Sequence, residues 1–437
     1  MWSEGVHHAG LPVSQLHLED ELIEQSKVFE ISKDLVWKSY LEVKSNRGSA
    51  GIDGISLLDF EKNLKKNLYK IWNRLSSGSY FPSPVKRVEI PKAAGGKRVL
   101  GVPTVSDRIA QTVVKMCLEP LWDKLFHENS YGYRPNKSAL DAVAITRKRC
   151  WRYSWVVEFD IKGAFDNIDH ELLMKAVSKH TDERWMLLYI ERWLKAPYQD
   201  ESGVLRESTL GVPQGGVISP LLMNLFMHYA FDCWMVRSYP KHPFSRYADD
   251  AVVHCNSLKV AEGLLQSIAM RLTECKLAIH PKKSKVVCCQ PRLKSGKGQS
   301  GNFTFLGYNF RPRYVVNKEG VGFTSFQPGV SNEASKQMRM KIRSWKLHRI
   351  TYRTLNDISL EYNSVLRGWW NYYGAFCPSE LRKVFVYFHK RLMLWVRRKY
   401  RRFKRRRMAS FFWLRRVALD NPDLFISWKI FGVTEAA

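Results

Sequence analysis

Several features that mark common protein classes are missing from this sequence. Its eight cysteines are scattered, with no CxxC pair and no paired histidine spacing, so neither a structural zinc site nor a disulfide framework is predicted. It has no run of about 18 uncharged apolar residues and no charged-then-apolar leader with a cleavage site. We therefore expect a cytoplasmic protein with no membrane-inserted segment.

Acidic residues are scarce relative to basic ones. The 437 residues include 70 Lys and Arg against 41 Asp and Glu, which gives a formal charge of +29 and a pI of about 9.8. Such an excess predicts a polyanionic partner, nucleic acid rather than a membrane. A hydrophobic fraction of 45% is ordinary for a globular protein, and the length predicts two or three domains.

The positive charge is concentrated towards the C-terminus. Residues 326–437 contain 24 Lys and Arg against 7 Asp and Glu, a net charge of +17, which leaves +12 for the rest of the chain. The first part alternates strand-like segments with segments of helical periodicity, and the second part has helical periodicity alone. The strand-like segments are 85–90, 155–159 and 251–255, and the helical ones are 171–180, 221–234 and 261–276. The sequence predicts an α+β part, a surface loop at 293–301, and an all-α part from about residue 326.

Two adjacent carboxylates, Asp249 and Asp250, lie between Phe-Ser-Arg at 244–246 and the apolar segment 251–253. This pattern predicts a tight hairpin between two strands. Burying both carboxylates is costly unless a cation neutralises them. An Asp pair in a solvated surface turn is the alternative interpretation.

A third carboxylate, Asp160, ends an apolar strand where the chain turns towards a helix. It either caps that helix or lies beside Asp249 and Asp250, where three carboxylates would suit two Mg²⁺ ions. Two ions roughly 3.5 to 4 Å apart would activate an attacking hydroxyl and stabilise a leaving pyrophosphate.

Two loops have residue types suited to phosphate or nucleotide contact. Lys92 and Arg98 flank a Gly-Gly turn, where both side chains can converge on a triphosphate; ordinary solvated side chains are the alternative. Gln214 lies in a Pro-Gln-Gly-Gly segment at the expected start of a helix, where its amide can contact a nucleotide and the glycines allow close approach of a template strand. A simple helix-start signal is the competing interpretation.

Residues 397–407 contain nine basic residues in eleven. In a helix this charge would encircle the axis and repel itself, so a phosphate backbone is the natural neutraliser. The alternative is a solvated tail.

Seven blocks, in order, resemble the reverse transcriptases encoded by bacterial group II introns. The most specific are FDIKGAFDNIDH (159–170), GVPQGGVISPLLMNLF (211–226) and RYADD (246–250), and the others are 85–111, 126–143, 277–287 and 303–310. Residues 368–373 (GWWNYY) resemble the thumb or maturase segment of the same family, and we expect Trp369 to pack in its core.

The resemblance implies a right-hand polymerase of α+β class. Residues 1–325 would form the N-terminal extension, fingers and palm, 326–390 a helical thumb or maturase domain, and 391–437 a basic segment that is a candidate for DNA binding. Many members carry an endonuclease domain at the C-terminus. Its Cys and His ligands have no counterpart after Trp413, so DNA cleavage is not expected.

The resemblance also implies roles for individual residues. Asp160 and Asp249 would be the principal metal ligands, completed by Asp250 and the main-chain carbonyl of Ile161. Phe165 would exclude a ribose 2′-hydroxyl, with a place in the core as the alternative. Nucleotide contacts are implied for Lys92, Arg98, Gly163, Ala164, Phe165, Gln214 and Lys283. Nucleic-acid contacts are expected at Gly307, in a primer-gripping hairpin, and at Arg401, Arg402, Arg405, Arg406 and Arg407.

The function implied is RNA-directed DNA synthesis with two Mg²⁺ ions, for which Mn²⁺ is a possible substitute, and with deoxynucleoside triphosphates, an RNA template and a DNA primer. Binding of group II intron RNA as a splicing maturase is also implied. Two alternatives stay open: an RNA-binding splicing cofactor with an idle polymerase site, and a reverse transcriptase recruited by its host for repair or phage defence. The intron class, the target DNA, the oligomeric state and the role of residues 1–25 do not follow from the sequence.

Overall fold

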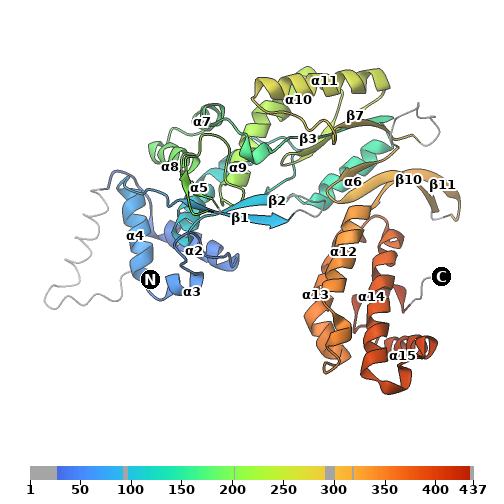
Figure 1. The fold of residues 1–437 in the computed structure, drawn as a ribbon. Coiled ribbons are helices and arrows are strands. Elements are labelled where there is room, and N and C mark those ends of the chain that lie inside the picture. The colour runs from blue at the N-terminus through green and yellow to red at the C-terminus, as the bar shows by residue number, and fades with distance from the viewer. Residues whose placement is uncertain (1–26, 92–96, 201, 291–300, 317–318, 434–437) are drawn as a thin grey trace. The chain divides into compact units, whose positions relative to one another are not determined.

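The structure is a computed structural model of the chain (Figure 1). The structure describes residues 27–91, 97–200, 202–290, 301–316 and 319–433. Contacts divide the chain into two compact units: unit 1 comprises Met1–Asn136, Ile161–Pro240 and Ser267–His280, and unit 2 comprises Lys137–Asp160, Lys241–Gln266 and Pro281–Ala437. Within the described residues, no helix has the length and apolarity needed to cross a bilayer.

Unit 1 is mainly helical, with one small sheet. Its helices are α2 (Lys33–Ser45), α3 (Leu57–Glu61), α4 (Leu64–Ser76), α5 (Val105–Trp122), α7 (His170–Ser178), α8 (Arg184–Leu194), α9 (Ser219–Met227) and α10 (Cys233–Ser238), with the 3-10 turn η1 (Ala164–Asp166) and the π-helix η2 (His228–Asp232). Its strands β1 (Val85–Pro91), β2 (Lys97–Val102), β4 (Tyr198–Gln199) and β5 (Leu205–Arg206) follow the order β2-β1-β4-β5. The long helix α5 starts at a side-chain cap, because the Thr104 hydroxyl accepts a hydrogen bond from the Asp107 N–H.

Unit 2 begins with α6 (Ala139–Cys150) and an antiparallel sheet in the order β6-β7-β3-β8. The strands are β3 (Trp155–Asp160), β6 (Phe244–Tyr247), β7 (Asp250–Cys255) and β8 (Lys285–Cys288). Val156, Val157 and Phe159 of the central strand β3 are fully buried, as expected for a strand that is covered on both faces. The helix α11 (Leu258–Glu274) runs from unit 2 into unit 1.

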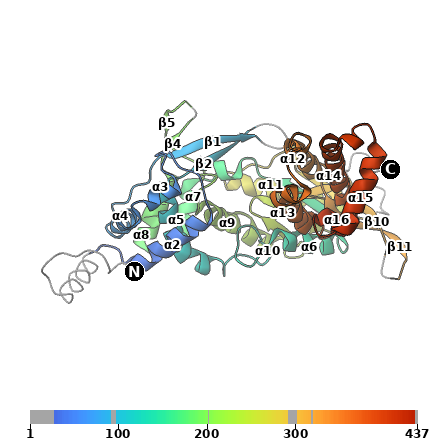
Figure 2. The same cartoon turned by 90° about the horizontal axis from the view of Figure 1, so that it is seen from below.

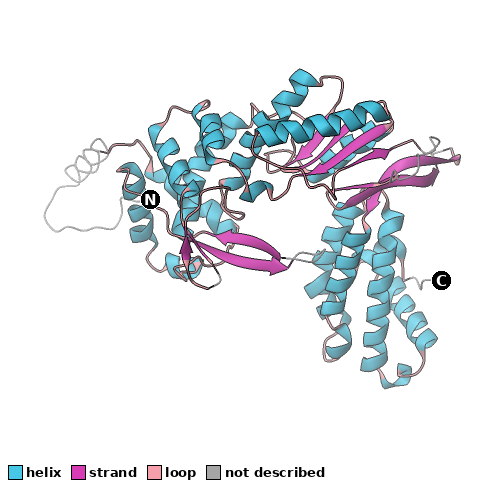
Figure 3. Ribbon diagram, turned by 45° about the horizontal axis from the view of Figure 1, so that its top comes forward, coloured by secondary structure: helices cyan, strands magenta, loops and turns pink. Residues whose placement is uncertain are grey.

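A second sheet in unit 2 joins β9 (Phe303–Phe305), β10 (Tyr308–Val316) and β11 (Gly322–Val330), drawn in magenta with the first sheet in Figure 3. β11 runs through Phe326, where we expected the all-α part to begin. That boundary is corrected: the first helix of the C-terminal part starts at Asn332, with the Ser331 hydroxyl as its cap. β10 and β11 alternate polar and apolar residues weakly, which explains why the sequence did not indicate them as strands.

The C-terminal part of unit 2 is helical, as predicted. It contains α12 (Asn332–Ser344), η3 (Leu347–Arg349), α13 (Leu355–Tyr373), α14 (Pro378–Lys399), η4 (Arg401–Phe403), α15 (Arg407–Asp420) and α16 (Ile426–Phe431), which lie together in Figure 2. Trp369 packs against this core as expected, with its ring stacked 6.0 Å from that of Trp345. The expected boundary at 390/391 falls inside α14.

Residues 391–437 are not a separate basic tail, at least up to residue 433, where the described part ends. Leu392, Trp395, Phe403, Phe425 and Trp428 are buried in the same apolar cluster as the preceding helices. The basic run 397–407 is also not one helix: it spans the end of α14, the turn η4 and the start of α15. Phe403, the apolar residue in the middle of the run, is buried and anchors this turn.

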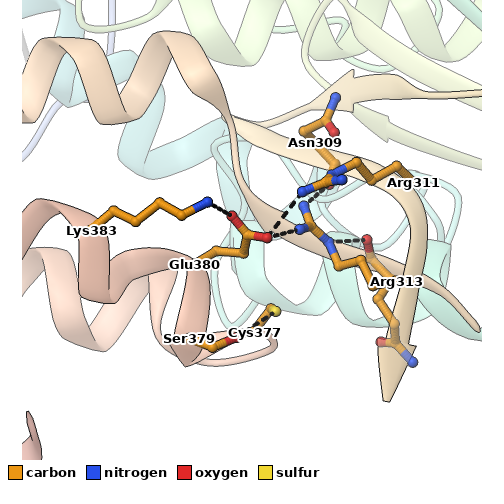
Figure 4. A network of polar contacts seen from close by, with 8 residues as sticks. Asn309, Arg311, Arg313, Cys377, Ser379, Glu380 and Lys383 are labelled. Carbon is orange, nitrogen blue, oxygen red and sulfur yellow. Dashed lines mark hydrogen bonds and ion pairs between the residues drawn. The ribbon is translucent and has the colours of Figure 1, made fainter. Parts of the chain in front are cut away.

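One carboxylate joins the sheet β9–β11 to the helices that follow it (Figure 4). Glu380, in the first turn of α14, pairs with Arg311 at 3.0 Å, with Arg313 at 2.5 Å and with Lys383 at 3.5 Å. The Arg313 side chain is only 6% exposed, so its charge depends on this partner. Arg313 also donates a hydrogen bond to the Gln327 carbonyl on β11. The network therefore ties β10, β11 and α14 together.

Candidate catalytic site

The two adjacent aspartates lie in the tight hairpin that the sequence predicts. Tyr247 and Asp250 form the last pair of the β6–β7 ladder, which leaves Ala248 and Asp249 at the tip. Ala248 has a positive φ of 56°, a conformation in which two-residue hairpins usually contain glycine. Arg246 is fully buried and donates a hydrogen bond to the Ala248 carbonyl at 3.0 Å. This buried guanidinium helps to hold the strained tip, a role that the sequence did not suggest.

Asp160 lies next to this hairpin. It is the last residue of β3 and the direct cross-strand partner of Asp250 in the β3–β7 ladder. Side chains of such partners point to the same face of a sheet, so the two carboxylates are neighbours. The helix-cap alternative for Asp160 is wrong, because the side chain that caps α7 belongs to Asp169.

The carboxylates disfavour one another's ionisation. Burial raises the pKa of Asp250 well above its ordinary value, and the charges of Asp249, Glu158 and Asp160 raise it further. Glu158 on β3 is the fourth carboxylate of this cluster. Burial likewise raises its pKa, and the nearby Lys285 opposes this rise. A hydrogen bond from the Leu306 N–H partly offsets the shift at Asp250. The site therefore concentrates more negative charge than its surroundings readily accommodate.

A cavity of about 400 Å³ opens beside these carboxylates. Its lining combines acidic and basic side chains, namely Glu158, Asp160, Asp250, Lys282, Lys283 and Lys285, together with Phe159 and Thr304. Lys283 Nζ lies 2.6 Å from Asp160 Oδ2. The ammonium of Lys283 places a positive charge next to Asp160. Among the described residues, no three Asp, Glu, His or Cys side chains are already grouped as a metal site, so ion binding would require the carboxylates of this cluster to draw together and Asp160 to part from Lys283.

The hairpin that carries Gly307 contacts Asp250. Leu306 and Gly307 form the two-residue turn between β9 and β10, and both have positive φ, at 52° and 77°. Such a turn is typical of the I′ type, for which leucine is an unusual residue. Because the Leu306 N–H donates to Asp250, the turn lies against the acidic cluster.

Aromatic residues of the GWWNYY segment hold this hairpin. The Tyr372 hydroxyl donates to the Leu306 carbonyl at 2.9 Å, and the Tyr308 hydroxyl donates to the Tyr372 carbonyl. A Cβ on Gly307 would lie 2.8 Å from the Tyr373 hydroxyl, so only glycine fits there without a shift. The end of α13 is therefore packed directly on the turn next to Asp250.

The remaining residues of the FDIKGAFDNIDH block lie in unit 1. Ile161 is buried and bridges Ile279, and Gly163 has a positive φ of 55° just before the turn η1. Ala164 and Phe165 are buried at 2% and 8% exposure. The low exposure of Phe165 is compatible with either of its two proposed roles.

Two of the predicted nucleotide contacts meet in unit 1. Arg98 Nε donates to Gln214 Oε1 at 2.8 Å, and Gln214 Nε2 donates to Asp166 Oδ2 at 3.1 Å. Asp166 and Gln214 line a cavity of about 220 Å³. Asp166 was not expected here, because 48 residues separate it from Gln214 and no local pattern links them. Lys92, the other predicted contact of this loop, lies outside the described residues.

The Pro-Gln-Gly-Gly segment does not start a helix. α9 begins only at Ser219, so Gln214 lies in the preceding loop. Gly215 has a φ of 121°, and a Cβ on it would lie 2.4 Å from the Gly101 carbonyl oxygen on β2. Close contact between two protein backbones thus requires this glycine. We had expected a different reason, namely the close approach of a template strand.

The five arginines expected to bind nucleic acid, Arg401, Arg402, Arg405, Arg406 and Arg407, are all exposed. They flank the buried Phe403 in the sequence, from η4 to the first residue of α15. These arginines therefore lie at the surface, outside the packed core.

Comparisons with known proteins agree with this architecture. Residues 90–310 match the family described as Reverse transcriptase (RNA-dependent DNA polymerase), and residues 335–413 match the group II intron, maturase-specific domain. The chain belongs to the reverse transcriptase family, and its polymerase part is followed by a maturase domain of group II introns. It is accordingly a group II intron type of RNA-directed DNA polymerase and maturase, with the right-hand α+β fold that the resemblance implied. Enzymes of this family use divalent metal ions, and the two domains imply binding of an RNA template and of intron RNA.

Individual relatives differ in how much of them the chain covers. Protein YkfC of Escherichia coli (strain K12) is 32% identical over 305 residues, which are 60% of this chain and 77% of that protein. The group II intron-encoded protein LtrA of Lactococcus lactis is 34% identical over 210 residues, 48% of this chain and 35% of LtrA. A putative COX1/OXI3 intron 1 protein of Saccharomyces cerevisiae is 33% identical over 202 residues, 46% of this chain and 24% of that protein.

Proposed function

We propose that the acidic cluster of unit 2 is the polymerase centre, in which Asp160, Asp249, Asp250 and the Ile161 carbonyl hold two Mg²⁺ ions that Mn²⁺ can replace. The observation that carries this proposal is the cross-strand pairing of Asp160 with Asp250 beside the strained tip that bears Asp249. Carboxylate and carbonyl oxygens are the ligands that these ions prefer. The raised pKa of Asp250 marks an excess of negative charge that cations would relieve.

When bound, the two ions would activate the primer 3′-hydroxyl and stabilise the charge on the leaving pyrophosphate. The protein itself would bind and orient the substrates, which are a deoxynucleoside triphosphate, an RNA template and a DNA primer. Lys283, whose ammonium contacts Asp160 in the structure, would turn this charge towards the triphosphate, since its stem is flexible. In the same proposal the Leu306–Gly307 turn positions the primer end, since it already contacts Asp250.

Residues of unit 1 would recognise the nucleotide. The pair of Arg98 and Gln214 supports this role. Arg98 Nε donates to the Gln214 amide, and the two terminal nitrogens of the guanidinium would donate to a phosphate. Gly163 and Ala164 would let the sugar approach the backbone, and Phe165 would exclude a 2′-hydroxyl. Lys92 would join Arg98 at the triphosphate.

The maturase domain would bind group II intron RNA, and the exposed arginines between α14 and α15 would contribute to this surface. A net charge of +17 in residues 326–437 supports a phosphate backbone as the partner.

The test is extension of a DNA primer on an RNA template by Asp249→Asn, with Asp182→Asn, an exposed aspartate of unit 1, as the matched control. We expect Asp249→Asn to lose at least about a thousandfold in the rate of extension, since loss of one strong transition-state interaction typically costs several kcal/mol. Its affinity for RNA should match that of Asp182→Asn. Extension by Asp249→Asn at the rate of the control would refute the assignment.

A further inference from the structure

Unit 2 contains a second cavity, of about 610 Å³, which shares no lining residue with the one beside Asp160. Aromatic, aliphatic and cysteine residues make up most of its wall, which comes from the end of α6, from the residues after β8, from β10 and β11, and from the segment before α14. The lining includes Arg147, Trp151, Phe323, Phe326, Phe376 and Cys377. This volume is within the usual range for sites that bind small ligands.

Arg147 is the one charged side chain of this lining. Its guanidinium lies 4.7 Å from the centre of the Trp151 ring and 5.8 Å from that of Phe376. Its buried Nε has no hydrogen-bond partner within the described residues. The cavity thus has a cation close to two aromatic rings, with no carboxylate among the described residues of its wall.

The rings of this cavity are accessible to a ligand. The side chains of Trp151 and Phe323 are 49% and 48% exposed, although both are large and apolar. Trp151 is fixed in orientation, because its indole N–H donates to the Phe326 carbonyl at 3.0 Å. Gln290, Thr324, Ser325 and Gln327 are polar residues of the same wall, where Gln327 Nε2 donates to Ser325 Oγ at 3.1 Å. Such a set matches the needs of a planar group that is polar at its edges and joined to an anion.

We propose that this cavity binds one unpaired nucleotide of a single-stranded RNA, with the base stacked on Trp151 or Phe323 and the adjacent phosphate on Arg147. Stacking on aromatic and guanidinium planes, with hydrogen bonds to the base edge, is how proteins recognise splayed-out RNA bases. Phe376 and Cys377 lie within the maturase-specific part, residues 335–413, which favours intron RNA as the source. The inference rests on the proposed binding of intron RNA, but it does not require the polymerase centre.

The experiment uses the full chain and a single-stranded oligoribonucleotide that contains 5-iodouridine. We compare its affinity for wild type, for Arg147→Gln and for Arg152→Gln, a neighbouring exposed arginine outside the cavity lining. Both variants lose one positive charge, so the control removes the general electrostatic contribution. Phe323→Ala removes an exposed ring on β11 and serves as a second variant that leaves the buried core intact.

We expect about tenfold weaker binding for Arg147→Gln and for Phe323→Ala, and less than about a twofold change for Arg152→Gln. Ultraviolet cross-linking of wild type should label the peptide that contains Trp151. Uridine 5′-monophosphate should compete for this cross-link, whereas inorganic phosphate, an RNA duplex and a DNA strand of the same sequence should compete much less. Primer extension on a prebound template should be the same in all variants.

Equal affinities for Arg147→Gln and Arg152→Gln, with cross-links away from Trp151, would overturn the inference while leaving intron RNA binding intact. Equal competition by the DNA strand would overturn the assignment to RNA. If wild type does not bind the oligoribonucleotide, both the inference and the proposed RNA binding fail, whereas loss of primer extension alone concerns only the polymerase centre.

Discussion

Asp160 and Asp250 face each other across β3 and β7, at the end of the ladder that joins the two strands. Burial and the neighbouring carboxylates raise the pKa of Asp250, so the folded protein binds this proton more tightly than the unfolded chain does. The free energy of unfolding must then fall as the pH rises from the unfolded pKa, about 4, through the folded pKa. The neighbouring acids thus make the site less stable at neutral pH when no cation is bound.

Asp250→Asn removes this penalty. With a chelator present, we expect the variant to have a higher melting temperature than wild type at pH 8 and a smaller advantage as the pH approaches 4. Thermal unfolding across this range measures the difference, and Asp182→Asn should track wild type throughout. An advantage that does not change with pH would mean that ionisation of Asp250 is not the cause.

Phe165→Val should increase the use of ribonucleoside triphosphates relative to deoxynucleoside triphosphates by roughly tenfold or more, because a smaller side chain leaves room for a 2′-hydroxyl. It should also lower the free energy of unfolding by about 2 kcal/mol, since Phe165 is buried. The measurement is the ratio of kcat/KM for the two substrates. A loss of stability with an unchanged ratio would assign Phe165 to the core alone.

Replacing Arg401, Arg402, Arg405, Arg406 and Arg407 with Gln should weaken nucleic-acid binding and flatten its salt dependence. Each phosphate contact that is lost reduces the slope of log K against log salt by about 0.9 on duplex DNA and about 0.7 on single strands. Because these side chains are exposed, the thermal stability should change little. A slope equal to that of wild type would place the main nucleic-acid surface elsewhere.

Glu380→Gln should lower the free energy of unfolding by about 2–4 kcal/mol, because it leaves the buried guanidinium of Arg313 without its carboxylate. Lys383→Gln is the matched control, since this exposed lysine contacts the same carboxylate and should cost less than about 0.5 kcal/mol. Urea-induced unfolding measures both. Similar costs for the two variants would show that the buried Arg313 does not depend on Glu380.

Features with a local origin could be predicted from the sequence. β3 and β7 are short apolar runs, and α7 and α11 have regular apolar spacing, so their residues carry the signal themselves. The hairpin with Asp249 and Asp250 was predictable because its apolar flanks are adjacent in the chain. The resemblance to a known family then assigned chemistry to these carboxylates.

Features that depend on distant residues could not be predicted. The Arg98–Gln214–Asp166 contacts join three separate segments, and the burial of Arg246 depends on packing around the hairpin. Charge alone suggested that residues 397–407 form one helix or a tail. Phe403 is instead buried in the apolar cluster of the C-terminal helices, and residues 397–407 include a turn there. This packing is a tertiary effect that the local composition does not indicate.

The most direct test of the account is a count of the divalent ions bound at the acidic cluster. Electron paramagnetic resonance of free Mn²⁺ during a titration gives this number for the enzyme with primer, RNA template and a non-hydrolysable deoxynucleoside triphosphate. We predict two tightly held ions for wild type and for Asp182→Asn, and loss of at least one of them in Asp249→Asn. Two ions held by Asp249→Asn with the affinity of wild type would contradict the claim that Asp160, Asp249 and Asp250 form the catalytic metal site.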